Sequence, residues 1–287
     1  MVKNELKVAS VVILYNPELE VLKNIAACAE QTEIVFVLDN SDSYNQTIID
    51  KIIIIDKVEY HNFNSNLGVA YALNYAAKLA IKNNFDFLLT MDQDSFLTPG
   101  MVDRMIEDCS SNEDVGIVSP LHRNRFRTQE IHTSIYEEVL FIKTSGNLLN
   151  LKIYQKAGPF NEDYFIDYVD IEYGMRLNML GYKVLKVNNA ILEHSEANLS
   201  EKKFFGIKFY PWNHKPIRWY YKIRNLLYME EKYKKHYPDF FKKEKAHYIR
   251  QFIKILLYEN NKLKKIKFGF EGFKAYKKKL VGIKKGV

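Results

Sequence analysis

Short apolar runs alternate with amphipathic stretches through the N-terminal part of the chain. The runs are rich in Val, Ile, Leu and Phe, which is typical of strands buried in a sheet. Between them, apolar residues recur at the three- and four-residue spacing of a helix that packs one face on a core. The runs cover residues 8–14, 34–38, 58–63, 87–91 and 115–119, and the helical patterns cover 19–26, 69–80 and 101–106. This alternation predicts an α/β fold with a mixed, mainly parallel sheet flanked by helices.

The C-terminal half is patterned less regularly. Further strands are expected near residues 139–143, 183–187 and 191–193, and further helices near 171–180 and 216–234. Residues 246–263 carry an apolar stripe with basic residues at its margins, which predicts an amphipathic helix. Aromatic residues interleave with lysines from residue 202 onward. We therefore expect a basic, mainly helical C-terminal extension.

Charge divides the chain near the same place. Residues 201–287 hold 25 Lys and Arg against 7 Asp and Glu, whereas residues 1–200 hold 17 against 28. A chain of 287 residues suits one large core with an appendage, because single cores stop growing near roughly 250 to 300 residues. We predict an α/β domain at 1–200 and a separate region at 201–287. The positive surplus of that region predicts a polyanion or an anionic membrane surface as its partner.

Several classes of protein are disfavoured by what the sequence lacks. Cys28 and Cys109 stand alone in helical patterns, so we expect a reducing compartment with neither a disulfide framework nor a zinc knuckle. The first residues do not resemble a signal peptide, and no run approaches the roughly 20 apolar residues of a membrane-spanning helix. We therefore expect a cytoplasmic protein. Neither G-x-G-x-x-G nor G-x-x-x-x-G-K-[ST] occurs, which disfavours a dinucleotide oxidoreductase and a P-loop ATPase.

Polar side chains follow each of the first four predicted strands. They are Asn16, Asp39 with Asn40, residues 62–66, and Asp92 with Asp94. In open α/β sheets the ligand binds beyond the carboxyl ends of the strands, so four loops would meet at one edge. Two alternately spaced carboxylates, Asp92 and Asp94, can share a hard divalent cation that neutralises a bound diphosphate. The alternative is that one of these aspartates caps a turn.

Nine motifs give the sequence a resemblance to family 2 glycosyltransferases of the GT-A fold. They lie, in the family's order, at residues 11–17, 37–41, 64–70, 91–95, 144–148, 165–172, 181–182, 194 and 216–225. Together they extend over about residues 8–230. The D-Q-D-S form at 92–95, the F-I-D-Y-V-D-I-E block and the R-x-Y-Y-x-x-R-N ending are most similar to bacterial rhamnosyltransferases. Residues 1–200 would then be the catalytic domain, with residues 201–287 completing its acceptor side.

The resemblance implies a nucleotide-sugar donor bound at the first three loops. Asp39 is similar to the family aspartate that accepts a hydrogen bond from the pyrimidine base, although a capping role is the alternative. Asn66 and Gly68 would close a loop near the nucleotide, where glycine allows close backbone approach. Tyr15 and Asn16 follow the first strand and belong to the same donor site.

The resemblance also implies that the donor binds with Mn²⁺ or Mg²⁺. Asp92 would face the ribose and the metal, and Asp94 would ligate the metal directly, with Gln93 between them on the donor side. His194, after the predicted strand 191–193, is similar to a histidine that this fold often supplies to the metal or the diphosphate. A purely structural histidine is the alternative.

An inverting transfer needs a carboxylate that takes the proton of the acceptor hydroxyl. Aligning Phe165 and Arg176 with the family's acidic motif makes Asp170 the base, with Asp167 as the second candidate. Glu172 is interpreted as an acceptor-orienting or structural residue. Since carboxylates are favoured at helix N-termini, a capping cluster is the alternative for at least one of the three.

The acceptor side is expected at Ser145, Gly146 and Asn147, where the glycine would let the sugar chain approach closely. A simple turn is the alternative. Arg218 and Arg224 have the chemistry to clamp the donor diphosphate in a bidentate manner. They could equally be interface residues.

The basic region has three interpretations. It could lie on an anionic membrane surface, which suits a lipid-linked acceptor and a peripheral location on the inner face of the cell membrane. It could be a packing helix or a homo-oligomer contact. Binding to nucleic acid is the least favoured of the three.

These observations predict an inverting, metal-dependent glycosyltransferase of bacterial surface polysaccharide synthesis, with dTDP-L-rhamnose as donor and a saccharide as acceptor. The motifs leave UDP-glucose, UDP-galactose and UDP-galactofuranose open as donors. A noncatalytic nucleotide-sugar-binding protein is the alternative outside enzymes.

Overall fold

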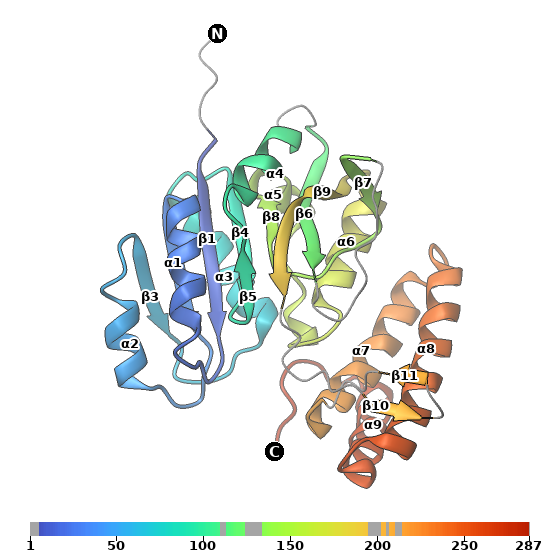
Figure 1. The fold of residues 1–287 in the computed structure, drawn as a ribbon. Coiled ribbons are helices and arrows are strands. Elements are labelled where there is room, and N and C mark those ends of the chain that lie inside the picture. Colours follow the sequence, from blue (N-terminus) through green and yellow to red (C-terminus); the bar gives the residue numbers. More distant parts are fainter. Residues whose placement is uncertain are drawn as a thin grey trace. The chain divides into compact units, whose positions relative to one another are not determined.

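A computed structural model describes residues 6–109, 113–123, 134–194, 202–204, 207–209 and 214–286. The chain divides into two compact units, each with its own core (Figure 1). Unit 1 comprises residues 1–162 and 170–195, and unit 2 comprises residues 163–169 and 196–287. This division differs from the boundary at residue 200 that the sequence predicted, because the short segment 163–169 belongs to the same unit as the C-terminal helices.

Unit 1 is built on a mixed sheet. Its strands are β1 (Val8–Leu14), β2 (Ile34–Asp39), β3 (Val58–Asn62), β4 (Phe87–Asp92), β5 (Ser95–Leu97), β6 (Val115–Arg123), β7 (Tyr136–Val139), β8 (Asn147–Asn150) and β9 (Lys183–His194). They are ordered β3-β2-β1-β4-β8-β6-β9-β5, with β7 paired to β9. The first four are parallel, whereas β8 is antiparallel to both neighbours. The carboxyl ends of β1 to β4 therefore meet at one edge.

Helices cover both faces of this sheet (Figure 1). They are α1 (Val21–Gln31), α2 (Gln46–Ile52), α3 (Val69–Lys82), α4 (Met101–Cys109), α5 (Leu151–Ala157) and α6 (Val169–Met179), with a 3-10 turn η1 at Glu162–Tyr164. One core lies between the sheet and α1, α2 and α4, where Val12, Ile25 and Met101 are fully buried. The alternating pattern predicted this α/β architecture, and it is confirmed.

Two strand predictions in the second half need correction. The strand expected at 139–143 is found as β7, which ends at Val139. Residues beyond it pass instead across α6, where Gly174 leaves space for the carbonyl of Leu140 and for Phe141. The two strands expected at 183–187 and 191–193 form the single strand β9, with a shift of register against β6 between them.

Unit 2 is mainly helical. It contains α7 (Pro216–Tyr233), α8 (Pro238–Tyr258), α9 (Lys262–Lys277) and the backbone of a small hairpin, β10 (Lys202–Phe204) with β11 (Ile207–Phe209). The helix expected over 246–263 is wrong in its bounds, because the chain turns between α8 and α9 with Asn261 in a left-handed conformation (φ 56°). None of the helices in the described part of the chain is long and apolar enough to cross a membrane.

Candidate active site

Asp39 ends β2 at the carboxyl edge of the sheet and is almost fully buried. Its Oδ1 accepts a hydrogen bond from the backbone N–H of Ser41 (3.0 Å), and its Oδ2 accepts one from the hydroxyl of Tyr60 (2.8 Å). Burial and the hydrogen bond to Asp39 raise the pKa of Tyr60 above its ordinary value, so this hydroxyl remains a donor. The carboxylate is thus held in one orientation, and each oxygen keeps a second lone pair for a ligand.

The loop after β3 is closed by amide side chains. Asn66 Oδ1 accepts hydrogen bonds from Asn40 Nδ2 (3.2 Å) and from the backbone N–H of Gly68 (3.0 Å). Asn40 Oδ1 accepts one from the backbone N–H of Leu67 (2.8 Å). Gly68, with φ at 90°, is the N-cap residue of α3. Asn66 and Gly68 therefore shape the loop, and their direct contact with a nucleotide stays a prediction.

Gln93 joins the ends of β1 and β4. Its Oε1 accepts a hydrogen bond from the backbone N–H of Tyr15 (2.8 Å), and its Nε2 donates one to the carbonyl of Tyr15 (3.3 Å). The next residue, Asn16, has a left-handed backbone (φ 49°) and donates its N–H to Ser41 Oγ (2.7 Å). Because both ends of its amide are engaged, Gln93 serves to fix these two loops together.

The aspartates of the D-Q-D segment lie where β4 ends. The backbone N–H of Asp92 donates to Ser145 Oγ (3.0 Å), so the segment before β8 lies against this loop. Asp94 is followed directly by Ser95, whose backbone pairs with that of His194 at the end of β9. The side chain of His194 lies outside the part of the chain that the structure describes. Among the side chains that are described, no three carboxylate, imidazole or thiol groups converge on one point.

Gly146 is placed by close packing. Its backbone is left-handed (φ 83°), and a Cβ there would lie 2.8 Å from Pro120 Cγ and 2.9 Å from Leu192 Cδ2. A strand is predicted near 139–143, just before residues 145–147, but these residues instead lead into β8. The N–H of Gly146 donates to the carbonyl of Thr90 (2.7 Å). The glycine is thus required by the protein's own packing, whatever its part in acceptor binding.

Asp170 lies in the first turn of α6 and lines a small cavity together with Thr90, Asn147 and Tyr173. The cavity has room for about one water molecule. Asn147 Oδ1 and the Tyr173 hydroxyl are buried and have no hydrogen-bond partner among the described residues. Because Thr90 precedes Asp92 by two positions on β4, the cavity places Asp170 at the same end of the sheet as the D-Q-D segment.

Glu172 does not reach an open site. Its side chain is 1% exposed and forms an ion pair with Arg176 one turn later (2.9 Å). Arg176 also donates to the carbonyls of Ala157 and Pro159 (2.8 Å each). The pair therefore ties α6 to the end of α5, which agrees with the structural interpretation of Glu172 rather than with contact to an acceptor.

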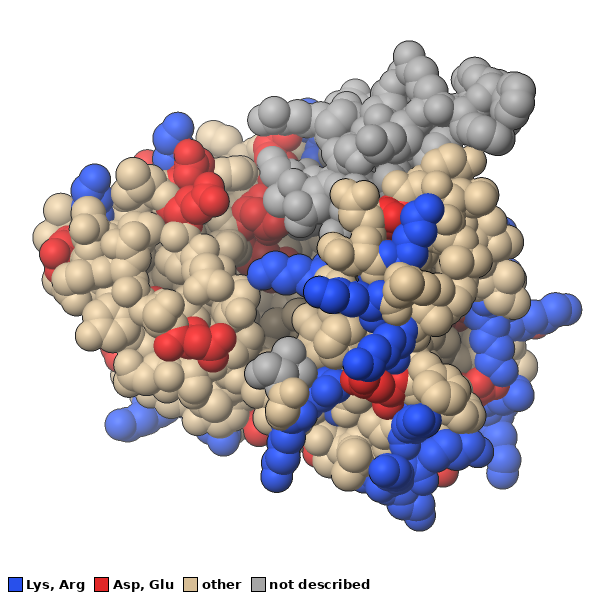
Figure 2. Space-filling view, turned by 90° about the horizontal axis from the view of Figure 1, so that it is seen from below, with Lys and Arg blue, Asp and Glu red and all other residues tan. Residues whose placement is uncertain are grey.

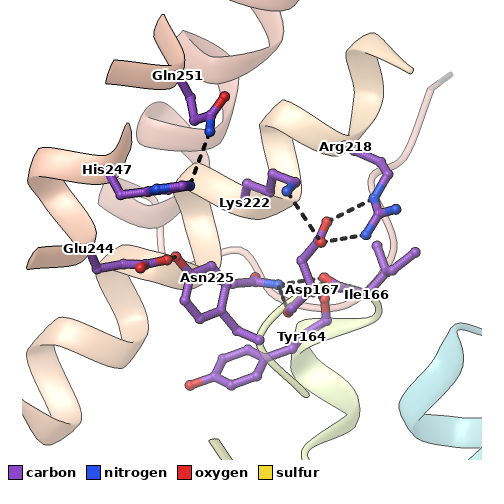
Figure 3. Close-up of polar contacts among 10 residues, drawn as sticks. Tyr164, Ile166, Asp167, Arg218, Lys222, Asn225, Glu244, His247 and Gln251 are labelled. Atoms are coloured by element: carbon purple, nitrogen blue, oxygen red, sulfur yellow. Dashed lines mark hydrogen bonds and ion pairs between the residues drawn. The ribbon is translucent and has the colours of Figure 1, made fainter. Parts of the chain in front are cut away.

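Asp167 is held by two cations of α7 (Figure 3). Arg218 binds both of its carboxylate oxygens (2.5 and 3.2 Å), and the ammonium of Lys222 lies 3.9 Å away. Burial alone would raise the pKa of Asp167, but the charges of Arg218 and Lys222 outweigh it and hold that pKa below its ordinary value. A carboxylate bound in this way is a weak base. Arg218, in turn, already has a carboxylate in the position where a diphosphate was expected.

Arg224 is fully buried in unit 2 and cannot clamp a diphosphate as predicted. It donates to the carbonyls of Gly282 (2.6 Å) and Asp163 (2.9 Å). The neighbouring Asn225 donates from Nδ2 to the carbonyls of Tyr164, Ile166 and Asp167, at 2.9 to 3.0 Å (Figure 3).

The sequence reasoning missed this role of Asn225. The available signal was an Arg-Asn pair within a helix of otherwise apolar and aromatic character. These two side chains satisfy the backbone of segment 163–167, which leads directly to α6 and Asp170.

A mixed sheet whose parallel half ends in aspartate-bearing loops is the architecture of nucleotide-sugar-dependent transferases of the GT-A type. The family model Glycosyl transferase family 2 matches residues 10–166, more than half of the chain, and the chain belongs to this family. It is therefore a glycosyltransferase of GT-A fold, as the motifs predicted. The sequence is 27% identical over 243 residues to the dTDP-rhamnosyl transferase RfbF of Shigella flexneri, covering 78% of this chain and 79% of that protein.

Solved structures agree on the fold. GalNAc-T7 with UDP, GalNAc and Mn²⁺ has a TM-score of 0.63 at 13% identity, over 96% of this chain. The mannosyltransferase PcManGT of Pyrobaculum calidifontis, in complex with GDP-Man and Mn²⁺, has a TM-score of 0.59 at 14% identity, over 80% of this chain. This chain spans 56% and 65% of the lengths of those two chains.

Proposed function

We propose that this chain transfers L-rhamnose from dTDP-L-rhamnose to a saccharide acceptor of bacterial surface polysaccharide synthesis. The observation that carries the proposal is the similarity to a dTDP-rhamnosyl transferase across more than three quarters of both chains. The donor site in unit 1 has suitable chemistry. Asp39, oriented by Ser41 and Tyr60, would accept a hydrogen bond from the N–H of the thymine ring.

A divalent cation, Mn²⁺ or Mg²⁺, fits the residues at the end of β4. Such ions are commonly held at nucleotide sites by one or two carboxylates together with the substrate's phosphates, so a complete protein cage is not needed. Asp94 and Asp92 would supply those carboxylates, and the pairing of Ser95 with His194 brings the end of β9 beside them. When bound, the ion would neutralise charge on the departing dTDP. Both solved relatives are complexes with Mn²⁺.

Asp170 is the base in this proposal. Its carboxylate would accept the proton of the acceptor hydroxyl while that oxygen attacks the anomeric carbon and the bond to dTDP breaks, which inverts the configuration in one step. The cavity shared with Thr90 and Asn147 supports this role, because it places Asp170 near the end of β4 within unit 1. Asp167 is less suited, since two cations hold its charge and its pKa is lowered.

The remaining residues of the proposal divide by what they contact. Tyr15, Asn16, Asn66, Gly68 and Gln93 would form the donor loops, which their mutual hydrogen bonds hold in place. The segment 145–147 would border the acceptor. The acceptor is proposed to be a growing saccharide on a lipid carrier.

The test is turnover of a panel of nucleotide sugars, measured as released nucleoside diphosphate with Mn²⁺ or Mg²⁺ and with chelator. We expect turnover of dTDP-L-rhamnose alone, its loss with chelator and in Asp94→Ala, and little change in Asp103→Ala, which alters an exposed aspartate of α4. Turnover of UDP-glucose, UDP-galactose or UDP-galactofuranose instead would refute the rhamnose assignment. Failure of every nucleotide sugar to bind would refute donor use altogether.

Two variants separate the candidate bases. Asp170→Asn should lower kcat by roughly 10² to 10⁴-fold while donor binding persists. Asp167→Asn should weaken the fold of unit 2 but leave the acidic limb of the pH–rate profile where it is. A comparable loss of kcat in Asp167→Asn that remains folded, with Asp170→Asn fully active, would transfer the role to Asp167.

A further inference from the structure

Helix α8 has a second apolar face, whose side chains are exposed. Its inner face buries Phe241, Tyr248, Gln251 and Ile255. Four large aliphatic side chains elsewhere on the helix are exposed: Ile249 (64%), Ile253 (51%), Leu256 (49%) and Leu257 (58%). A surface helix ordinarily has one apolar stripe, which faces its core. The exposed set therefore needs a separate explanation.

These four residues form one continuous stripe, which we call the α8 outer face. At the helical rotation of about 100° per residue, they fall within an arc of about 100° on the side away from the buried set. Arg250 and Lys254 follow along one edge of this arc. Large aliphatic groups are thus gathered in one place with positive charge at their margin, and they are not scattered singly as on an ordinary surface.

The positive charge around this face is left over after the internal ion pairs are formed. From residue 245 to the end, the chain has 13 Lys and Arg and only 2 Asp and Glu. Both acidic residues are engaged, Glu259 with buried Lys265 (2.6 Å) and Glu271 with Lys284 (3.4 Å). Within the described residues, no carboxylate pairs with Arg250 or Lys254. On the one face that Figure 2 shows, lysine and arginine side chains are more numerous over the residues of unit 2 than over those of unit 1.

We infer that the α8 outer face docks on an anionic phospholipid surface. A lipid interface accepts aliphatic side chains into the boundary of its acyl chains and attracts nearby Lys and Arg to its headgroups, so it matches both properties of the face. A second copy of the chain would bring two positively charged faces together. A nucleic acid would neutralise the basic groups but leave the four aliphatic groups in water. The inference is independent of the donor sugar and of the catalytic base.

The experiment is cosedimentation of the full chain with vesicles of phosphatidylcholine alone and of phosphatidylcholine mixed with phosphatidylglycerol. We expect binding to the mixed vesicles, weakened by salt, and little binding to the neutral ones. The double variant Ile253→Gln with Leu257→Gln should bind at least about tenfold more weakly. The matched control is Ile53→Gln with Ile54→Gln, which removes two exposed isoleucines (54% and 80%) of unit 1 and should bind like the unaltered chain.

Arg250→Gln with Lys254→Gln tests the charge, and should weaken binding to the mixed vesicles by roughly tenfold or more while making it less dependent on salt. Circular dichroism of each variant confirms that the helices remain folded. Equal binding by the Ile253/Leu257 variant and its unit 1 control would overturn the inference. The inference would also be overturned if the unaltered chain were a dimer in solution and the Ile253/Leu257 variant were a monomer, which would assign the face to a second copy. Salt-sensitive RNA binding without vesicle binding would assign the basic groups to nucleic acid.

Discussion

The packing of α9 against α7 depends on one glycine, and a matched glycine three residues earlier makes the dependence measurable. A Cβ built at Gly272 would lie 2.3 Å from the backbone carbonyl oxygen of Tyr220 in α7. A Cβ at Gly269 would meet its nearest neighbour, Ile223 Cγ1, at 3.7 Å, an ordinary contact. Gly269→Ala and Gly272→Ala therefore make the same chemical change in one helix under opposite steric conditions.

The expected magnitudes follow from these distances. Alanine is favoured over glycine in a helix interior by about 1 kcal/mol, so Gly269→Ala should stabilise unit 2 by about 0.5 to 1 kcal/mol. At Gly272 the same gain is offset because α9 must withdraw from α7 by about 1 Å to reach an ordinary carbon–oxygen contact. Overpacking of this kind costs about 1 to 3 kcal/mol, so Gly272→Ala should be net destabilising by about 1 to 2 kcal/mol.

Tryptophan fluorescence during urea unfolding is the suitable assay. The chain has two tryptophans, at positions 212 and 219, and Trp219 is buried in α7 of unit 2. The two variants share the change in unfolded-state entropy, so the difference between them isolates the contact with Tyr220. We expect their free energies of unfolding to differ by about 1.5 to 3 kcal/mol. Equal stability of the two variants, or a more stable Gly272→Ala, would refute the proposed packing.

Three further predictions concern unit 1 and the buried charges. Glu172→Gln breaks a buried ion pair and should lower the free energy of unfolding by about 3 kcal/mol in urea, leaving Arg176 uncompensated; an unchanged midpoint would contradict this. Burial and neighbouring cations lower the pKa of His214 to about 3. Between about pH 6.5 and 3 only the unfolded state binds that proton, so the free energy of unfolding should decrease as the pH is lowered, by on the order of 1 kcal/mol per pH unit. His214→Gln should make the free energy of unfolding less dependent on pH in this window. Gly146→Ala should destabilise the protein by about 1 to 3 kcal/mol more than Gly181→Ala, because both have a left-handed φ but only Gly146 is surrounded by side chains; equal thermal shifts would disprove it.

The first strands could be predicted from the sequence because their apolar runs are buried on both faces of a parallel sheet. Residues 139–143 have the same composition, yet only Val139 is in a strand. The path of the following residues depends on the space beside Gly174, which lies more than thirty positions along the chain. Such tertiary contacts leave no local pattern.

The candidate site shows the same division. Residues at strand ends, such as Asp39 and Asp92, follow from topology alone and lie at the expected edge. The direction of the Arg224 side chain does not follow from topology. An arginine in an aromatic helix can point to solvent and bind a phosphate, or point into the core and bind backbone carbonyls. Here the segment 163–164 supplies the carbonyls, and no spacing within α7 could reveal that partner.

The contacts of Asn225 also bear on how the chain folds during synthesis. The carbonyl of Tyr164 is made 61 residues before the amide that binds it. At translation rates of about 5 to 20 residues per second, the segment leading to Asp170 waits roughly 3 to 12 seconds for its partner to be made. During that interval α6 and β9 are produced, so the sheet of unit 1 can assemble before this segment is fixed. A chain truncated near residue 200 would be arrested at that stage, with its Asp170 segment lacking these hydrogen bonds.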